Sequence, residues 1–357
     1  MKILVIQLKR IGDVILTTPV FNALRRRYPH AQIDFLVESP SHEAVRDHPC
    51  LDRVLVYDPR TPLRWIAALR REGYDWVIDF LGTPRSALIA AASGAAVKAG
   101  PGHVFSSWAY SHQFIQNAAT EYAAVAKLKM LAQLGLELPA RATELYFALN
   151  SDEKDQAARQ LQAVFPGAGR VGTAHSPHAP PLIGIAPHSR RVTRQWPQAH
   201  FIELGRRITQ DLGADIIVFW GPGENAGAAT IAAGIGARAR ACPPTKTLNQ
   251  LGAYLWHCDA FVTNCNGPRH IATALGIPTL TVHGSSDPAA WNPPPENGET
   301  ENSRFPFVRR EDLCCIGCRK NLCPYELQCL RDLSPQKVFD KLMRLFQRRK
   351  IEAYERG

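Results

Sequence analysis

The stretch that decides the fold is ILVIQLKRIGDVILTTP, residues 3–19. It opens with four consecutive apolar residues, and such a short continuous run is typical of a strand buried on both faces of a parallel sheet. A Gly-Asp pair, Gly12 and Asp13, follows the strand, just before a second apolar run. We therefore expect the chain to turn from strand to helix here, with Gly12 allowing a tight backbone turn.

The same alternation of Val/Ile/Leu-rich runs and amphipathic stretches continues along the chain. Strands are predicted at 2–8, 32–38, 53–58, 75–81, 181–187, 214–224, 259–265 and 278–284. Helices are predicted at 20–28, 63–73, 85–93, 121–136, 200–213, 247–258, 269–276 and 334–349. Strands and helices in alternation indicate an α/β protein with mainly parallel sheets covered by helices.

The length of 357 residues exceeds what one core usually organises, so two domains are expected. Residues 166–181 are rich in Gly, Pro, Ser and His and predict a linker. Their G-x-G-x-x-G pattern runs into Pro180 and Pro181 rather than into a helix, which argues against a dinucleotide loop. The sequence thus predicts a first domain at 1–165, a linker at 166–181, a second domain at 182–333 and a C-terminal helix at 334–357.

The net charge of +10 favours an anionic partner, such as a nucleotide, a phosphorylated substrate or an acidic membrane surface. No nucleic-acid recognition motif occurs, so nucleic acid is not an expected partner. No apolar run approaches the roughly 20 residues of a membrane span, and the opening run is shorter than a signal-peptide core. We expect a cytoplasmic protein whose nine cysteines are mostly reduced.

Each predicted strand of the second half ends in a turn of small residues: PHSRR, GPGEN, NCNGPRH and HGSSDP. Ligands of open α/β sheets bind at the carboxyl ends of the strands. Together the four turns predict that the second domain is the main binding domain, although any one of them could be a bare connection.

These segments, in this order, resemble glycosyltransferase family 9, the ADP-heptose:lipopolysaccharide heptosyltransferases. The resemblance covers nearly the whole chain; besides residues 2–37, its carriers are DWVIDFLGTPRSALIAAASGA, IGIAPHSRRVTRQWPQAHFIELGRRI, FWGPGE, VTNCNGPRHIATALGIPTLTVHGSSDPAAWNP and the C-terminal cysteines. It implies a GT-B architecture of two Rossmann-like domains facing a cleft, with the acceptor bound by the first and the donor mainly by the second. It also implies transfer with inversion and without a catalytic metal, and the absence of a D-x-D pair agrees with this expectation.

The family's catalytic base corresponds to Asp13. An inverting transfer is a single displacement, in which one carboxylate takes the proton of the attacking hydroxyl. Lys9 and Arg10 are expected to lie near this carboxylate. The alternative is that Asp13 only caps the following helix, as Asp often does.

The resemblance also implies a donor site that holds a diphosphate with positive charge and backbone amides. Arg194 is expected to hold the phosphates, Glu224 to contact the nucleotide, and His270 to bind rather than act in acid–base chemistry. The predicted donor-binding residues are Ser189, Thr193, Arg194, Glu224, Cys265, Asn266, Gly267 and His270.

Cys265 is the main departure from the family, which carries Asp at this position. A thiol is a weak donor and lacks the charge of a carboxylate. The difference weakens donor binding or changes the accepted sugar if the family's Asp contacts that sugar.

Three arginines of the first half are predicted to bind a phosphorylated acceptor: Arg60, Arg64 and Arg85. Arginine suits phosphate because its guanidinium is a planar fork of donors. Arg60 and Arg64, four residues apart, are expected to share one face of a helical turn.

Five cysteines crowd into 314–329: Cys314, Cys315, Cys318, Cys323 and Cys329. A structural zinc ion held by four of them is one reading. Reduced structural cysteines are the favoured reading, because the spacing is irregular for a zinc ribbon. We therefore predict no cofactor and no metal.

The leading hypothesis is an inverting transferase that moves heptose from ADP-heptose to a phosphorylated, lipid-linked oligosaccharide of the lipopolysaccharide inner core. Such an acceptor predicts peripheral contact with the cytoplasmic face of the inner membrane. One alternative, a related transferase with another nucleotide sugar, rests on Cys265. A second, a non-catalytic nucleotide-sugar-binding protein, rests on Cys265 and on the cysteine cluster as an interaction module.

Overall fold

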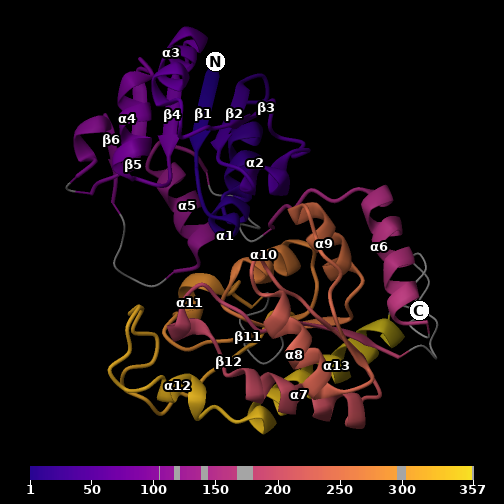
Figure 1. Ribbon diagram of the computed structural model, residues 1–357. Coiled ribbons are helices and arrows are strands. Elements are labelled where there is room, and N and C mark those ends of the chain that lie inside the picture. Colours follow the sequence, from indigo (N-terminus) through magenta and orange to yellow (C-terminus); the bar gives the residue numbers. More distant parts are fainter. Residues whose placement is uncertain (104, 116–120, 138–143, 167–179, 296–302, 356–357) are drawn as a thin grey trace. The chain divides into compact units, whose positions relative to one another are not determined.

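The computed structural model describes residues 1–357 except 104, 116–120, 138–143, 167–179, 296–302 and 356–357 (Figure 1). The chain divides into two compact units, Met1–Ala148 and Leu149–Gly357. Almost all of the predicted linker, 166–181, lies outside the described residues. Within the described part, no helix combines the length and the apolar character that a bilayer span requires.

The first unit is a six-stranded parallel sheet covered by helices. Its strands are β1 (Lys2–Ile6), β2 (Gln32–Val37), β3 (Arg53–Val56), β4 (Trp76–Asp79), β5 (Val97–Pro101) and β6 (His112–Phe114). Its helices are α1 (Ile11–Ile15), α2 (Thr18–Arg27), α3 (Pro62–Glu72), α4 (Pro84–Ala92) and α5 (Ala123–Ala132), with 3₁₀ turns η1 (Ser41–Val45) and η2 (Ser107–Ala109). The strand order is β3-β2-β1-β4-β5-β6, and Ile3 to Ile6 of the central strand are fully buried.

The second unit repeats this architecture. Its strands are β7 (Leu182–Ala186), β8 (Asp215–Val218), β9 (Ala239–Ala241), β10 (Ala260–Asn264), β11 (Thr279–Val282) and β12 (Phe307–Val308). Its helical segments are α6 (Ser151–Val164), η3 (Val192–Arg194), α7 (Gln198–Asp211), α8 (Asn225–Ile235), α9 (Leu248–Trp256), α10 (Gly267–Ala274), α11 (Pro288–Trp291), α12 (Gln328–Arg331) and α13 (Pro335–Glu355). The strand order is β12-β11-β10-β7-β8-β9, again all parallel.

Both sheets have the same topology. Counted within its own unit, each reads 3-2-1-4-5-6, which is the strand order of the Rossmann fold. The predicted α/β class, with two Rossmann-like parallel-sheet units and a C-terminal helix, is confirmed. In this topology ligands bind beyond the carboxyl ends of the two strands where the order reverses, here β1 and β4 in the first unit and β7 and β10 in the second.

Helix α6 belongs to the second unit, whereas the sequence places it before the linker in a first domain of 1–165. It packs on α9: the backbone carbonyl of Lys154 lies 2.8 Å from Nε2 of His257, and the Lys154 ammonium lies 3.9 Å from the ring centre of Trp256. These contacts explain why the first unit ends at Ala148.

Helix α8 was not predicted from the sequence. Its residues, NAGAATIAAGI, are almost all small and show no clear helical period. Small residues allow α7 and α8 to approach closely. A Cβ added at Gly205 of α7 would lie 2.4 Å from Cδ1 of Ile235, and one added at Gly234 of α8 would lie 2.8 Å from Cδ1 of Ile202. The two glycines are therefore required by the close contact of these helices.

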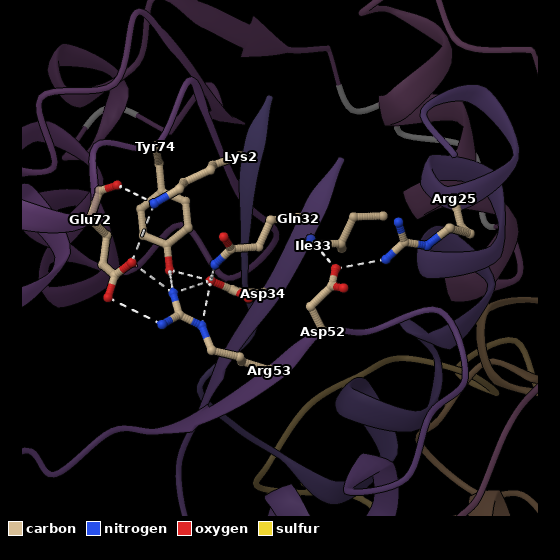
Figure 2. Close-up of polar contacts among 9 residues, drawn as sticks. All are labelled: Lys2, Arg25, Gln32, Ile33, Asp34, Asp52, Arg53, Glu72 and Tyr74. Carbon is tan, nitrogen blue, oxygen red and sulfur yellow. Dashed lines mark hydrogen bonds and ion pairs between the residues drawn. The ribbon is translucent and has the colours of Figure 1, made fainter. Parts of the chain in front are cut away.

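A polar network joins the amino ends of β1, β2 and β3 (Figure 2). Its centre is the carboxylate of Asp34, whose side chain is fully buried. One Asp34 oxygen accepts hydrogen bonds from Tyr74 Oη at 2.6 Å, Arg53 Nη2 at 2.7 Å and Gln32 Nε2 at 2.8 Å. Arg53 also binds Glu72 at 2.9 Å. The network lies at the sheet edge opposite the carboxyl ends of the strands.

Candidate functional site

Asp13 lies in the first turn of α1, just beyond the carboxyl end of β1. The N-cap of α1 is Arg10, so Asp13 is not the capping residue. Gly12 is a buried residue inside α1, so the expected tight glycine turn does not occur; the connection from strand to helix is made by residues 7–10. No hydrogen bond to the Asp13 carboxylate occurs among the described residues, which leaves it open to a bound hydroxyl.

Lys127 of α5 is a buried cation that contacts the Asp13 backbone, and the sequence did not single it out. Its Nζ donates hydrogen bonds to Gln7 Oε1 at 2.8 Å, to the Asp13 carbonyl at 2.9 Å and to Thr17 Oγ1 at 2.6 Å. Burial lowers the pKa of Lys127 to about 8, against the opposing effect of Asp13 and Asp79. The sequence feature that could have identified Lys127 is its place on the apolar face of the helix predicted at 121–136.

Asp79 shapes the neighbouring turn, which follows β4. It pairs with Ile6 across β1 and β4, and its side chain is fully buried. Its Oδ1 accepts hydrogen bonds from the amides of Leu81 at 2.8 Å and Gly82 at 3.3 Å, and its Oδ2 accepts one from Tyr110 Oη at 2.7 Å. Burial raises the pKa of Asp79, which these hydrogen bonds oppose. Asp79 therefore fixes the backbone that leads into α4.

Arg85, at the start of α4, lies on the same edge as Asp13. Glu38 forms ion pairs with Arg85 at 3.1 Å and with Lys9 at 3.4 Å, so it joins the turns after β1, β2 and β4. Lys9 was expected beside Asp13 and is engaged by Glu38 instead.

Arg60 and Arg64 follow β3, farther from the switch point. Arg60 is 87% exposed and makes a forked ion pair with Asp58, with Nε–Oδ1 3.0 Å and Nη2–Oδ2 3.1 Å. Arg64 is an exposed residue of α3. The prediction that the two arginines share a helical turn is wrong, because Thr61 is the N-cap and Pro62 begins α3 after Arg60.

The second unit holds its predicted residues at the reversal between β7 and β10. Asn264, at the end of β10, donates to the Pro187 carbonyl at 2.7 Å and accepts from the Trp196 amide at 3.0 Å. Asn266 donates to the His188 carbonyl at 3.0 Å. These bonds hold the turn carrying Ser189 against the turn that opens α10.

Arg194 occupies η3 in the turn after β7. Its guanidinium lies 6.0 Å from the ring centre of Trp291, and its Nε is buried without a hydrogen-bond partner among the described residues. A buried donor without a partner costs free energy, and a bound phosphate oxygen would satisfy it. The hydroxyl of Thr193, by contrast, donates to the Lys320 carbonyl at 2.9 Å and accepts from Ser285 Oγ at 3.0 Å.

Glu224 closes the turn after β8. Its Oε2 accepts a hydrogen bond from the Gly221 amide at 2.7 Å and lies 3.7 Å from Nδ1 of His188, a residue the sequence did not single out. The only sequence signal for His188 was its place directly after a strand end. Glu224 is the N-cap residue of α8, although its side chain makes no capping bond.

Helix α10 begins beside this site. Asn266 caps it by accepting a hydrogen bond from the Arg269 amide at 3.2 Å, and Gly267 is its first residue. Cys265 is 5% exposed between β10 and the cap. His270 is buried in the first turn, with its ring centre 6.1 Å from that of Trp291. Pro268 has no amide N–H and the Arg269 amide is bonded to Asn266, which leaves the Gly267 amide as the donor that the helix start offers to an anion.

The cysteine segment braces the same loops. The amides of Gly317 and Arg319 donate to the carbonyls of Gly284 at 3.3 Å and Ser285 at 2.7 Å. All five cysteines of the segment are free thiols. Burial and the thiols of three other cysteines of the segment raise the pKa of Cys329 to about 11. In the part of the chain that the structure describes, no three His, Cys, Asp or Glu side chains are grouped as metal ligands; the absence of a metal stays a prediction.

Comparison with known proteins identifies the class of protein, a glycosyltransferase, and its family. The model of glycosyltransferase family 9 (heptosyltransferase) matches residues 63–309. Lipopolysaccharide heptosyltransferase 1 of Pseudomonas aeruginosa is 25% identical, over 96% of this chain and 97% of the relative.

Two solved structures share the fold. The glycosyl transferase of family 9 from Veillonella parvula has a TM-score of 0.79 at 21% identity, covering 97% of both chains. The ADP-heptose lps heptosyltransferase II of E. coli has a TM-score of 0.75 at 21% identity, covering 98% of this chain and all of the other. The chain belongs to glycosyltransferase family 9, the heptosyltransferase family.

Proposed function

We propose that this enzyme transfers heptose from ADP-heptose to a phosphorylated sugar of the lipopolysaccharide inner core, with inversion. The observation that carries the proposal is Asp13, a carboxylate without a hydrogen-bond partner among the described residues, at the reversal of the first sheet in a chain of family 9. Relatives that are lipopolysaccharide heptosyltransferases support the choice of donor and acceptor.

In this proposal the reaction is one displacement. The acceptor hydroxyl attacks the anomeric carbon of the heptose, and the new C–O bond forms as the bond to the diphosphate breaks. The hydroxyl proton passes to Asp13, and ADP leaves with the electron pair. A base in reach of the attacking hydroxyl contributes typically 10²–10⁴-fold to such a step.

The second unit is proposed to bind the donor. Arg194, with its unsatisfied Nε, and the start of α10, with the Gly267 amide, neutralise the leaving diphosphate. Glu224 is proposed to contact the nucleotide and His270 to line the site. Ser189 and Asn266 border the same turns, whereas Thr193 contributes by holding Lys320 and Ser285 in place.

The first unit is proposed to bind the acceptor. Arg85 lies on the Asp13 edge and is the stronger candidate for its phosphate; Arg60 and Arg64 extend the basic surface beyond β3. A lipid-linked acceptor places the enzyme at the cytoplasmic face of the inner membrane as a peripheral protein. The proposed mechanism uses no metal.

Cys265 favours a second candidate, a related transferase that uses another nucleotide sugar. Calorimetry with ADP, UDP and GDP, followed by turnover with the matching heptose and hexose donors, separates the two. ADP is expected to bind most tightly, and ADP-heptose to give an inverted glycoside by NMR of the product. Tighter binding of UDP or GDP would mean that the donor is a sugar of that nucleotide and not ADP-heptose. Binding of ADP without turnover on any inner-core acceptor would support a non-catalytic binding protein.

A further inference from the structure

Lys127 is a buried ammonium to which the displacement described above gives no role. Its side chain belongs to α5 and the residue is only 8% exposed. An ammonium has three N–H donors and no acceptor, and here each donor has its own oxygen: Gln7 Oε1, the Asp13 carbonyl and Thr17 Oγ1. The group is thus fully hydrogen-bonded in a place with little exposure to solvent.

These three bonds hold both ends of the segment that carries Asp13. Gln7 directly follows β1, and Thr17 follows the last turn of α1. Thr17 Oγ1 itself donates to the Asp13 carbonyl at 2.7 Å. Because α1 has only five residues, it is far too short to be stable as an isolated helix. Its geometry depends on such tertiary contacts, and Lys127 supplies three of them.

The charges around Lys127 point to the same segment. Asp13 of α1 and Asp79 of β4 are the charged groups that act on the ammonium, while its other close neighbour is the ring of Phe80, 5.5 Å away. Burial outweighs the two carboxylates and lowers the pKa of Lys127 to about 8. Buried ionisable groups with a shifted pKa are frequent at functional sites, and this one lies beside the proposed catalytic base.

We propose that Lys127 is a positioning residue for Asp13, which fixes the α1 segment so that the carboxylate stays at the carboxyl end of β1. The inference rests on the proposed function, in which Asp13 takes the proton. A displacement of about 1 Å at a reacting group can cost on the order of 10²-fold in rate, so loss of this anchor should lower turnover rather than donor binding.

A double-mutant cycle tests the proposal. The variants are Lys127→Met, Asp13→Asn and the two combined, with Lys129→Met as the matched control; Lys129 is on the same helix, two residues away, with half of its side chain exposed. Lys127→Met is expected to lower kcat by 10- to 100-fold, with the donor KM within threefold of wild type. The double variant is expected to be no more than threefold slower than Asp13→Asn alone, and the control to keep full activity.

The outcomes separate the inference from the proposed function. If Asp13→Asn lowers turnover at least 100-fold and Lys127→Met has no effect, or if the two losses multiply in the double variant, Lys127 does not act through Asp13 and the inference fails alone. If Asp13→Asn retains wild-type turnover, the proposed function fails and the inference fails with it. Circular dichroism confirms that each variant is folded.

A second variant keeps the test open if Lys127→Met does not fold. In the wild type kcat is expected to fall as pH rises above about 8, because the ammonium loses one donor on deprotonation. Lys127→Arg keeps its charge at this pH and is expected to remove that alkaline decline up to pH 10. The same decline in Lys127→Arg as in the wild type would overturn the proposal.

Discussion

Replacing Asp34 by Ala should destabilise the first unit severely while leaving catalysis intact. Its buried carboxylate accepts hydrogen bonds from Tyr74, Arg53 and Gln32 (Figure 2). Removing one partner of a buried ion pair costs about 3–5 kcal/mol. Arg53 keeps Glu72 at 2.9 Å and is 40% exposed, so Glu72 and water offset part of the loss. We therefore expect a decrease of about 3 kcal/mol in the free energy of unfolding.

Urea unfolding, followed by circular dichroism and tryptophan fluorescence with a separate transition for each unit, measures this decrease. Tyr74→Phe removes only one hydrogen bond to the carboxylate and should cost about 1.5–2 kcal/mol. Asp47→Ala is the matched control: it breaks an Asp–Arg pair of 3.0 Å at the surface, where Asp47 is 67% exposed, and should cost less than about 1 kcal/mol.

The network lies at the amino edge of the sheet, so kcat of Asp34→Ala without urea should stay within twofold of wild type. A loss of stability as small as that of Asp47→Ala would refute the reasoning about the buried pair. A large fall in kcat with normal stability would refute the separation of the two edges.

Three further outcomes are expected. Arg194→Ala should weaken ADP binding by about ten- to a hundredfold in calorimetry, since a charge-assisted hydrogen bond contributes about 1.5–3 kcal/mol. The control Arg190→Ala, which changes an exposed neighbour, should alter the Kd for ADP less than twofold. Burial lowers the pKa of His48 to about 4, so as the pH falls the unfolded chain takes up the proton before the folded chain does. The free energy of unfolding therefore decreases between pH 6.5 and 4. In urea unfolding, His48→Gln should reduce the decrease between pH 7 and pH 5 by about 2 kcal/mol. Cys265→Asp should lower the KM for ADP-heptose and also lower the melting temperature, because it buries a carboxylate at a site only 5% exposed; an unchanged KM would remove this position from the donor site.

The fold could be predicted because each central strand is a continuous apolar run followed by a turn and an amphipathic helix. The same pattern placed Asp13, Arg194 and Cys265 in the segments that follow β1, β7 and β10, where the structure has them. Short edge strands such as β6 and β9, with three residues each, carry too little pattern to be seen.

The side-chain partners could not be predicted, because they depend on contacts between distant residues. Thr193 looks like a free hydroxyl in sequence, yet it is bound to the carbonyl of Lys320. Lys127 looks like an interruption of an apolar helix face, and only the packing of α5 beside the α1 segment reveals its three acceptors. The place of Arg60 was misjudged because α3 starts at Pro62, two residues after Arg60, so that Arg60 lies outside the helix.

The most direct test of the account is the rate of ADP release by Asp13→Asn with saturating ADP-heptose and inner-core acceptor. The substitution keeps the shape of the side chain and removes its capacity to take a proton. The account predicts a kcat at least 100-fold below wild type, or about 2.7 kcal/mol in the barrier, with the Kd for the donor within threefold. A kcat within threefold of wild type would contradict it.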